Sequence, residues 1–247
     1  MTGVLVSAGL LALAVVLAAA GGLGVARELT VAAVRAGVQL AVVGLVIAVV
    51  FEQAGLAAGF IVVMLTAAAL TAGRRLRPLA RGGLRAAAAI GTGAAAALVP
   101  LLALGAFSTR PRELVPVAGI LIGGAMAACS LTGRRLLEAV ADGLPAIEAR
   151  LALGVSARTA LAPALRTAVA TGLVPALDQT KNVGLVTLPG TFVGLLLGGA
   201  SPARAAAVQL TVLLAILAVQ TIAALTLAGL VARALVRPGE RVVLPDA

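Results

Sequence analysis

The chain has 247 residues, of which 62% are hydrophobic and 11% are charged, and its mean hydropathy is +1.15. This composition is typical of a polytopic membrane protein and excludes an ordinary soluble domain. The net charge of +10 comes from arginines that lie between apolar stretches without stacking aromatic residues, so we expect no nucleic-acid partner. With no histidine and a single cysteine, Cys129, the chain predicts neither an internal disulfide nor a tight metal site of its own.

Seven apolar stretches are long enough to cross about 30 Å of hydrocarbon as helices. They predict an all-α, multi-pass protein of the plasma membrane, with a single transmembrane domain over residues 1–247. The predicted spans are 4–24, 34–51, 55–72, 86–106, 115–132, 176–198 and 206–231. Most arginines fall in alternate connecting segments, so the positive-inside rule predicts an outside N-terminus and a cytoplasmic C-terminus.

Residues 133–167 are more polar than the predicted spans and form the longest predicted cytoplasmic segment. Within it, Ile147, Leu151 and Val155 follow helical spacing, and Gly154 favours the end of that helix. A short amphipathic helix either lies on the membrane surface or inserts into a groove of a partner. The residues alone leave both interpretations open.

The sixth predicted span contains the candidate functional residues. Asp178 and Lys181, the only lysine, lie one helical turn apart and predict a pair that neutralises itself or faces a polar cavity. If the helix enters the membrane only near Val183, the pair is instead an anchor at the cytoplasmic interface. Pro189 and Gly190 predict a break in the helix, and a break at this depth either lines an aqueous path or is covered by protein.

Polar side chains around this break are the candidates for a transport pathway or hinge. The full set is Asp178, Gln179, Thr180, Lys181, Thr187, Pro189, Gly190 and Thr191. Small residues four positions apart form smooth stripes against which another helix can pack closely. The predicted packing positions are Gly119, Gly123, Gly190, Gly194 and Gly198.

Missing motifs restrict the class of protein. No GxxxxGK[ST] loop is present, because Lys181 is followed by Asn182, so we expect no enzyme activity, no cofactor and no ATP site in this chain. An intramembrane protease is not supported, because there is no histidine and Asp178 has no second aspartate at similar depth. An ion-coupled secondary transporter or channel remains an alternative, because an Asp–Lys pair beside a broken helix suits it.

The run Asp178-Gln-Thr-Lys-x-Val-Gly-Leu-Val-Thr-Leu-Pro-Gly190, followed by Gly198-Gly-Ala-Ser-Pro202 and Gln209, resembles the signature of the FetB-type ABC transporter permeases. This family is assigned to iron export, and its plant relatives are linked to aluminium tolerance. The resemblance implies the transmembrane permease subunit of an ABC transporter that exports iron or another metal. It also implies that two copies form the pathway and that a separate subunit hydrolyses ATP. Gly124 departs from the family, which has asparagine at that position.

A second similarity concerns the expected partner. Glu148-Ala149, with Gly154 six residues after the glutamate, is similar to the EAA loop of ABC importer permeases, whose coupling helix docks in a cleft of the ATP-binding subunit. The resemblance implies that Glu148, Ala149, Arg150 and Gly154 couple this chain to its ATPase. An interfacial helix without a partner remains the alternative.

Overall fold

A computed structural model describes residues 2–79 and 81–243 of the chain. The elements are α1 Thr2–Ala20, α2 Ala26–Val50, α3 Ala54–Gly73, the 3-10 helix η1 Arg74–Leu76, α4 Gly82–Ala103, α5 Pro111–Asp142, α6 Leu144–Ala152, α7 Ala157–Asn182, α8 Gly190–Leu197, α9 Pro202–Leu235, β1 Val236–Arg237 and β2 Arg241–Val242. In the described ranges, seven helical stretches are long and apolar enough to cross a membrane. The predicted all-α, multi-span fold is therefore confirmed.

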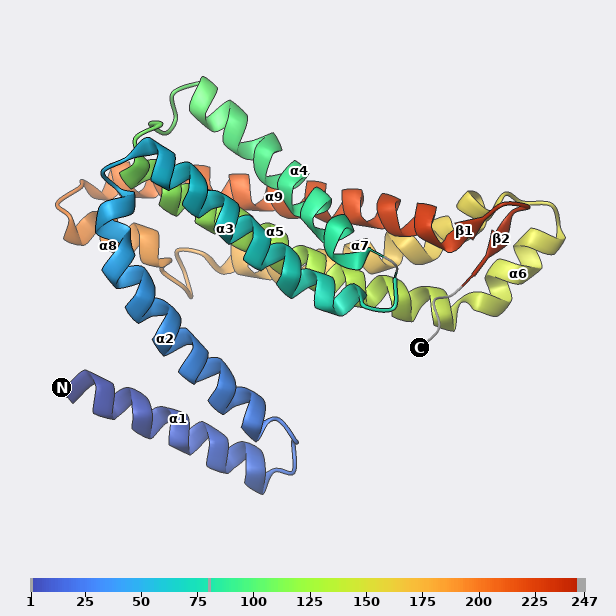
Figure 1. The fold of residues 1–247 in the computed structure, drawn as a ribbon, viewed down its shortest axis with the longest axis horizontal. Helices are drawn as coiled ribbons and strands as arrows, with labels where there is room; N and C mark the ends of the chain where they lie inside the picture. The colour runs from blue at the N-terminus through green and yellow to red at the C-terminus, as the bar shows by residue number, and fades with distance from the viewer. Residues whose placement is uncertain (1, 80, 244–247) are drawn as a thin grey trace. The chain divides into compact units, whose positions relative to one another are not determined.

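The chain divides into two compact units, Met1–Leu56 and Ala57–Ala247. In the first, α1 and α2 lie side by side (Figure 1) and are joined by a turn in which Gly22 and Gly24 have positive φ. Almost all of α1 is exposed, Ala18 being its one buried residue. Apolar helices with so little buried surface suit a hydrocarbon solvent. That residues 1–247 form a single permease domain stays a prediction.

In the second unit, α5, α7 and α9 run side by side, and α4 packs across α9 (Figure 1). The centre is built largely of alanine, with Leu76, Leu136 and Leu227 among its fully buried larger side chains. Small residues allow the backbones to approach closely, which is how helices gain packing energy where hydrocarbon gives no hydrophobic driving force. At the crossing of α5 and α7, a Cβ on Gly172 would lie 3.1 Å from Cα of Thr132.

The α4–α9 contact gives a prediction about stability. A methyl group on Gly93 would lie 2.8 Å from the carbonyl oxygen of Val219 and 3.0 Å from Cβ of Ala223. Neither atom can rotate away, so we expect Gly93→Ala to destabilise the fold by about 1–3 kcal/mol, as overpacking does. Thermal unfolding in detergent measures this. Gly91→Ala is the matched control, because the nearest atom there is Leu65 Cδ2 at 4.0 Å; equal midpoints for the two variants would contradict the contact.

The bounds predicted for the sixth spanning helix, 176–198, are wrong. α7 covers Ala157–Asn182 instead. Ser156 caps its first turn by accepting a hydrogen bond from the N–H of Thr159. The charges near its start lowered its apolar character in the sequence, whereas the more apolar stretch after Asn182 contains the residues that end the helix.

The predicted cytoplasmic segment 133–167 is correspondingly too long. α5 continues through Asp142, and α7 begins at Ala157, so the connection between them is α6 and its two short links. Gly154, with φ of +80°, follows the end of α6, as the sequence predicted. The polar residues before and after that connection thus belong to the ends of long helices.

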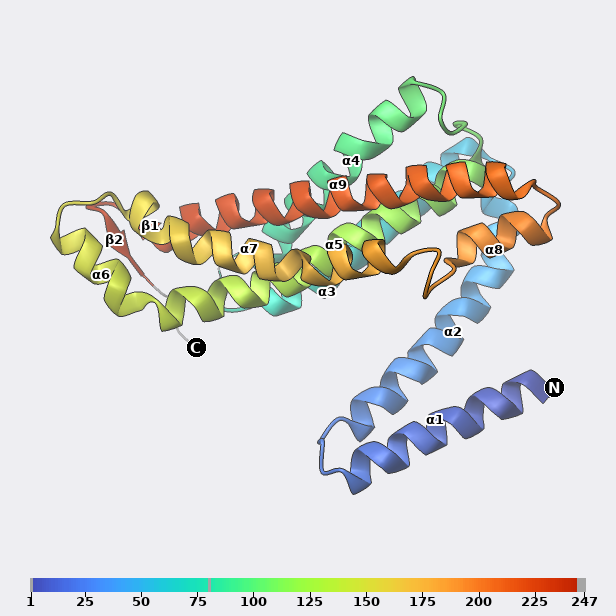
Figure 2. The ribbon, with the colours of Figure 1, turned by 180° about the vertical axis from the view of Figure 1, so that it is seen from behind.

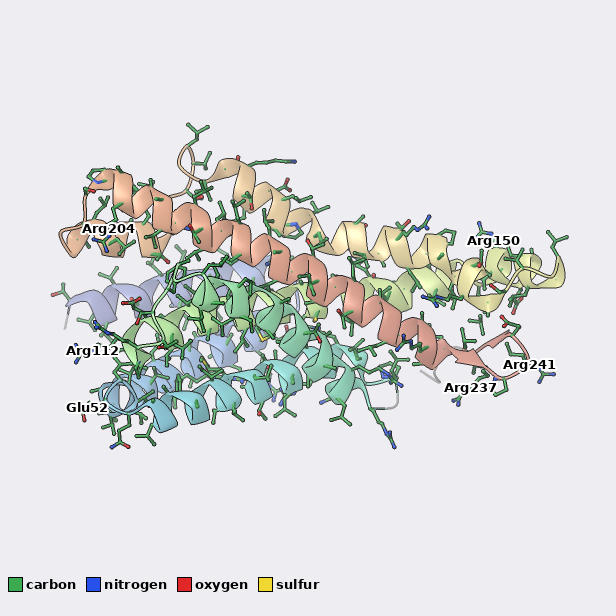
Figure 3. The ribbon with its side chains drawn as sticks, turned by 90° about the horizontal axis from the view of Figure 1, so that it is seen from above. Glu52, Arg112, Arg150, Arg204, Arg237 and Arg241 are labelled. Atoms are coloured by element: carbon green, nitrogen blue, oxygen red, sulfur yellow. The ribbon has the colours of Figure 1, made fainter. Side chains whose placement is uncertain are left out.

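Arginines gather at the two ends of the second unit. Figure 3 shows Arg112 and Arg204 at one end, and Arg150, Arg237 and Arg241 at the other. The second end, where α6 and the β1–β2 hairpin lie, is called the α6 end below. The separation of the arginines follows the alternation read from the sequence. Which end is cytoplasmic stays a prediction.

Candidate functional site

The helix break predicted at Pro189 is present between α7 and α8. α7 ends at Asn182, and the chain forms an irregular loop until Pro189 caps α8 (Figure 2). In this loop, which we call the 183–189 loop, the N–H of Gly184 donates to the carbonyl of Thr187 at 2.9 Å. The N–H groups of Val186 and Thr187 both donate to the carbonyl of Asn182. The loop therefore satisfies part of its own backbone, as irregular chain at membrane depth must.

A cavity of about 180 Å³ lies beside this loop, between α5, α7, α8 and α9. Its polar lining in the described chain comes from α7, α8 and α9: Gln179, Thr180, Thr191, Gln209 and Gln220. Gln209 and Gln220 are 6% and 8% exposed, and Oε1 of each has no hydrogen-bond partner among the described residues. They lie eleven positions apart, about three helical turns, and so share one face of α9. Buried carboxamides without partners are costly, so this cavity is built for a polar occupant.

The cavity lies in the middle of the spans. Ile120 lines it from α5. At 1.5 Å per residue, Ile120 is about 14 Å along the helix from Pro111 and about 21 Å from Arg134, where the apolar run of α5 ends. On α9, Gln220 is likewise about 20 Å from Arg233. Gln209, in contrast, is about 8 Å from Arg204, so the polar lining extends from mid-span toward the Arg204 end.

Asp178 and Lys181 belong to the same turns of α7 as two cavity residues but are not part of the cavity lining. Nζ of Lys181 is 3.8 Å from Oδ1 of Asp178, and the side chains of Lys181 and Asp178 are 73% and 60% exposed on the single chain. They sit on the last turns of α7, on the face opposite to Gln179 and Thr180, which line the cavity. The expected contact is present. The pair does not begin the sixth span, because α7 begins at Ala157 and ends at Asn182; that the pair anchors a helix end at a membrane interface stays an alternative prediction.

The structure brings together only part of the predicted pathway set. Gln179, Thr180, Pro189 and Thr191 line the cavity, and the other members are exposed outside its lining: Asp178, Lys181, Thr187 and Gly190. Sequence reasoning missed Gln220, although a glutamine inside an apolar run is itself a signal of a polar site.

Gly124, the departure from the resembled family, lies beside Gln220. A Cβ on Gly124 would lie 3.6 Å from Nε2 of Gln220. The place where the resembled family has an asparagine is thus next to a carboxamide supplied by α9. The polar group that α5 lacks is present in the same neighbourhood on another helix.

The predicted packing glycines behave differently from one another. A Cβ on Gly119 would lie 3.3 Å from Sδ of Met64, so Gly119 brings α5 close to α3. Gly123, Gly190 and Gly194 face open space, and Gly198 meets only the backbone of its own helix. The stripe on α8 is therefore uncovered in the single chain.

The residues predicted to couple the chain to an ATPase lie on and just after the short helix α6. Ile147 is buried, with Leu151 and Val155 half-buried beside the core, while Glu148 and Ala149 are exposed. The predicted inward spacing is thus confirmed.

The ends of this connection are fixed by hydrogen bonds. Nη1 of Arg150 donates to the carbonyl of Ala160 at 3.2 Å, so this predicted coupling residue holds α6 to α7. The N–H of Ala157 donates to the Glu240 carboxylate, which ties the β1–β2 hairpin to the start of α7. α6 is therefore a braced platform with an exposed acidic residue, Glu148.

These features define a class: a polytopic helical membrane protein with a polar cavity at mid-span beside a broken helix. The chain belongs to the UPF0014 family, described as an uncharacterised protein family, whose family model matches residues 1–236. It is 36% identical to "UPF0014 membrane protein STAR2" of Oryza sativa subsp. japonica over 87% of this chain and 76% of the relative. It is 33% identical to "Protein ALUMINUM SENSITIVE 3" of Arabidopsis thaliana over 87% of this chain and 79% of the relative.

A bacterial relative carries a functional name. The chain is 32% identical to "Probable iron export permease protein FetB" of Escherichia coli (strain K12), over 72% of this chain and 70% of the relative. The family resemblance predicted from the sequence is therefore confirmed, and the chain is a member of a membrane permease family. No solved structure matches the chain.

Proposed function

We propose that the chain is the transmembrane permease subunit of an ABC exporter, that two copies enclose the pathway, and that a separate subunit hydrolyses ATP. The observation that carries this proposal is the Asp178–Lys181 pair. It lies on the last turns of α7, directly before the helix break, and is largely exposed on the single chain. Charges that face lipid within a span are costly, so in the membrane the pair faces protein or water. A passage between two copies supplies both.

The lining chemistry supports a hard cation as the substrate. Carboxamide and hydroxyl oxygens line the cavity near the break, from Gln179, Thr180, Thr191, Gln209 and Gln220, and the Asp178 carboxylate lies on the outer face of the same turns of α7. Oxygen ligands without histidine or thiolate hold a transition metal weakly, which suits an ion that must leave again. The name of the bacterial relative, a probable iron export permease, agrees with iron as this substrate.

The α6 end is the proposed docking place for the ATP-binding subunit. Glu148 and Ala149 form an exposed patch on a helix that is braced from below, which suits insertion into a groove of a partner. With that end in the cytoplasm, α9 brings the C-terminus inside and the predicted N-terminus lies outside.

Purification in mild detergent tests the proposal. We expect an ATP-binding protein to co-purify with the tagged chain. In vesicles that contain the chain alone, without nucleotide, we expect no uphill transport of ferrous iron. Concentrative transport under those conditions would instead establish the ion-coupled secondary transporter.

A further inference from the structure

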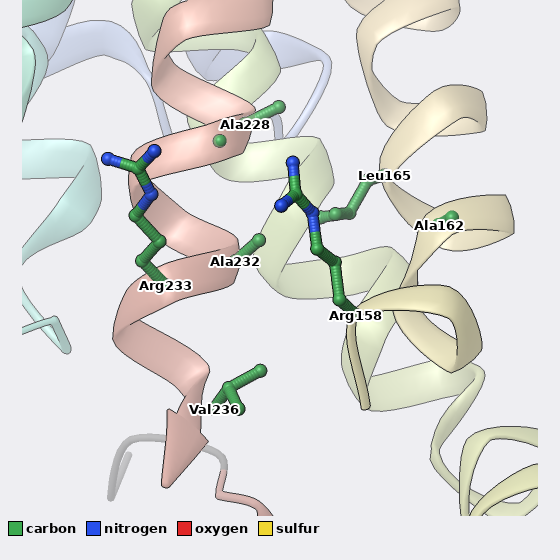
Figure 4. A pocket seen from close by; sticks show the side chains of 8 residues that line it. Arg158, Ala162, Leu165, Ala228, Ala232, Arg233 and Val236 are labelled. Carbon is green, nitrogen blue, oxygen red and sulfur yellow. The ribbon is translucent and has the colours of Figure 1, made fainter. Parts of the chain in front are cut away.

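A second, larger cavity lies at the α6 end, between the start of α7 and the end of α9 (Figure 4). Its volume is about 430 Å³. Small and apolar groups form its floor, among them Leu165 of α7 and Ala228, Gly229 and Ala232 of α9. Two arginines also line the cavity, Arg158 of α7 and Arg233 of α9. This cavity shares no residue with the mid-span cavity.

The two arginines have no anionic partner within the described chain. Figure 4 shows their guanidinium groups on either side of Ala232, both side chains extending from just below the level of Ala232 toward that of Ala228. The ion pairs of the described residues join other groups, Glu138 being held by Arg134 and Arg135. Two cations thus flank an apolar floor, and the complementary occupant is anionic at one end and apolar at the other.

The depth of this cavity fits the headgroup layer. Leu227, which precedes Ala228 on α9, packs against Gly133 of α5. A Cβ on Gly133 would lie 3.5 Å from Cδ2 of Leu227. Gly133 is followed at once by Arg134 and Arg135, where the apolar run of α5 ends. The Ala228 side of the cavity is therefore level with the boundary between hydrocarbon and headgroups. The headgroup layer beyond this boundary is about 5–8 Å thick on each side of a bilayer.

We propose that this cavity binds an anionic phospholipid from the leaflet at the α6 end. The phosphate lies between the guanidinium groups of Arg158 and Arg233, and the apolar part of the lipid covers Ala228, Gly229 and Ala232. Paired guanidinium groups favour a phosphate oxygen cluster, and the alanine and glycine floor leaves room for an acyl chain. The site is independent of the transport proposal, because it uses neither the mid-span residues nor α6.

Native mass spectrometry of the purified full chain tests this inference, with phosphatidylglycerol and phosphatidylcholine as the lipid probes. We expect the wild type to prefer phosphatidylglycerol. Each arginine near an anionic headgroup contributes roughly a fivefold preference. Arg158→Gln/Arg233→Gln removes two such contributions and should therefore reduce the preference about 25-fold. Arg237→Gln/Arg241→Gln is the matched control, because it removes the same charge at the same end and should leave the preference unchanged. Arg158→Lys/Arg233→Lys should retain most of it and guards against a folding defect.

Three results would overturn the inference. One is an equal loss of preference in the two glutamine double variants, which would mean that only net charge matters. Another is equal binding of inorganic phosphate and phosphatidylglycerol, which would assign the site to a soluble anion. The third is unchanged lipid binding in Arg158→Gln/Arg233→Gln together with loss of a protein partner, which would make the cavity a protein interface.

Discussion

Asp178→Asn is expected to reduce iron transport by at least about tenfold while the protein still inserts in the membrane. Asp178 is the one carboxylate on the last turns of α7, directly before the helix break, and it lies 3.8 Å from the ammonium of Lys181. Without the carboxylate, Lys181 remains as an unpaired positive charge that repels a cation. A charge at this depth is worth on the order of 2–3 kcal/mol, and about 1.4 kcal/mol is a factor of ten. ATP-dependent uptake of ferrous iron into inverted vesicles, with the partner present, measures the effect.

Two further variants separate a pathway role from simple anchoring. Asp142→Asn removes an exposed carboxylate at the α6 end and should leave transport within about twofold, as surface charge changes usually do. Asp178→Asn/Lys181→Met removes both charges, so no unpaired lysine remains, and it should not restore transport. If Asp178→Asn and Asp142→Asn reduce transport equally, or if the neutral double variant transports normally, Asp178 is no part of the passage.

Glu148→Lys is expected to abolish the stimulation of ATP hydrolysis by the chain. Glu148 is exposed on α6, and the helix beneath it is fixed by buried Ile147 and by the hydrogen bond from Arg150 to Ala160. The reversed charge therefore changes the docking surface without disturbing the support. If Glu148 pairs with a cation of the ATP-binding subunit, reversal replaces attraction by repulsion and costs several kcal/mol at a buried contact. ATPase activity of the reconstituted complex measures it.

Gly154→Pro provides an independent approach to the same surface. Gly154 has φ of +80°, and proline is confined to about −65°, so the link between α6 and α7 must rearrange. We expect normal membrane insertion and lost coupling. Asp142→Lys, a charge reversal beside α6, is the control for Glu148→Lys and should keep the stimulation. Normal stimulation in Glu148→Lys would place the docking surface elsewhere.

Sequence patterns identified the spans best where apolar runs were long and uninterrupted. The first five predicted spans and the last each overlap a helix of the structure, and the break before Gly190 is where proline and glycine predicted it. The inward face of α6 followed from the spacing of Ile147, Leu151 and Val155. Local propensities determine features of this kind, because they depend on residues within one or two turns.

The sixth span could not be placed this way. Apolarity favoured residues after Asn182, but the chain there carries Gly184 with positive φ and Pro189, and the helix instead uses the more polar stretch before Asn182. Its arginines lie near one end, where long side chains reach the interface. The cavity was equally hidden, since Gln220 and Thr191 come together only when α8 and α9 pack. Contacts between distant segments depend on the packing of whole helices.

The 183–189 loop has a mechanical consequence. Its internal hydrogen bonds, from Gly184 to Thr187 and from Val186 and Thr187 to Asn182, belong to the loop and to the last turn of α7. Its tip is apolar, with Leu185 92% exposed. The loop is therefore a self-bonded turn rather than a slack linker. Because Val183 and Pro189 line the polar cavity, this turn forms part of the cavity wall, and its apolar tip points away into the surroundings.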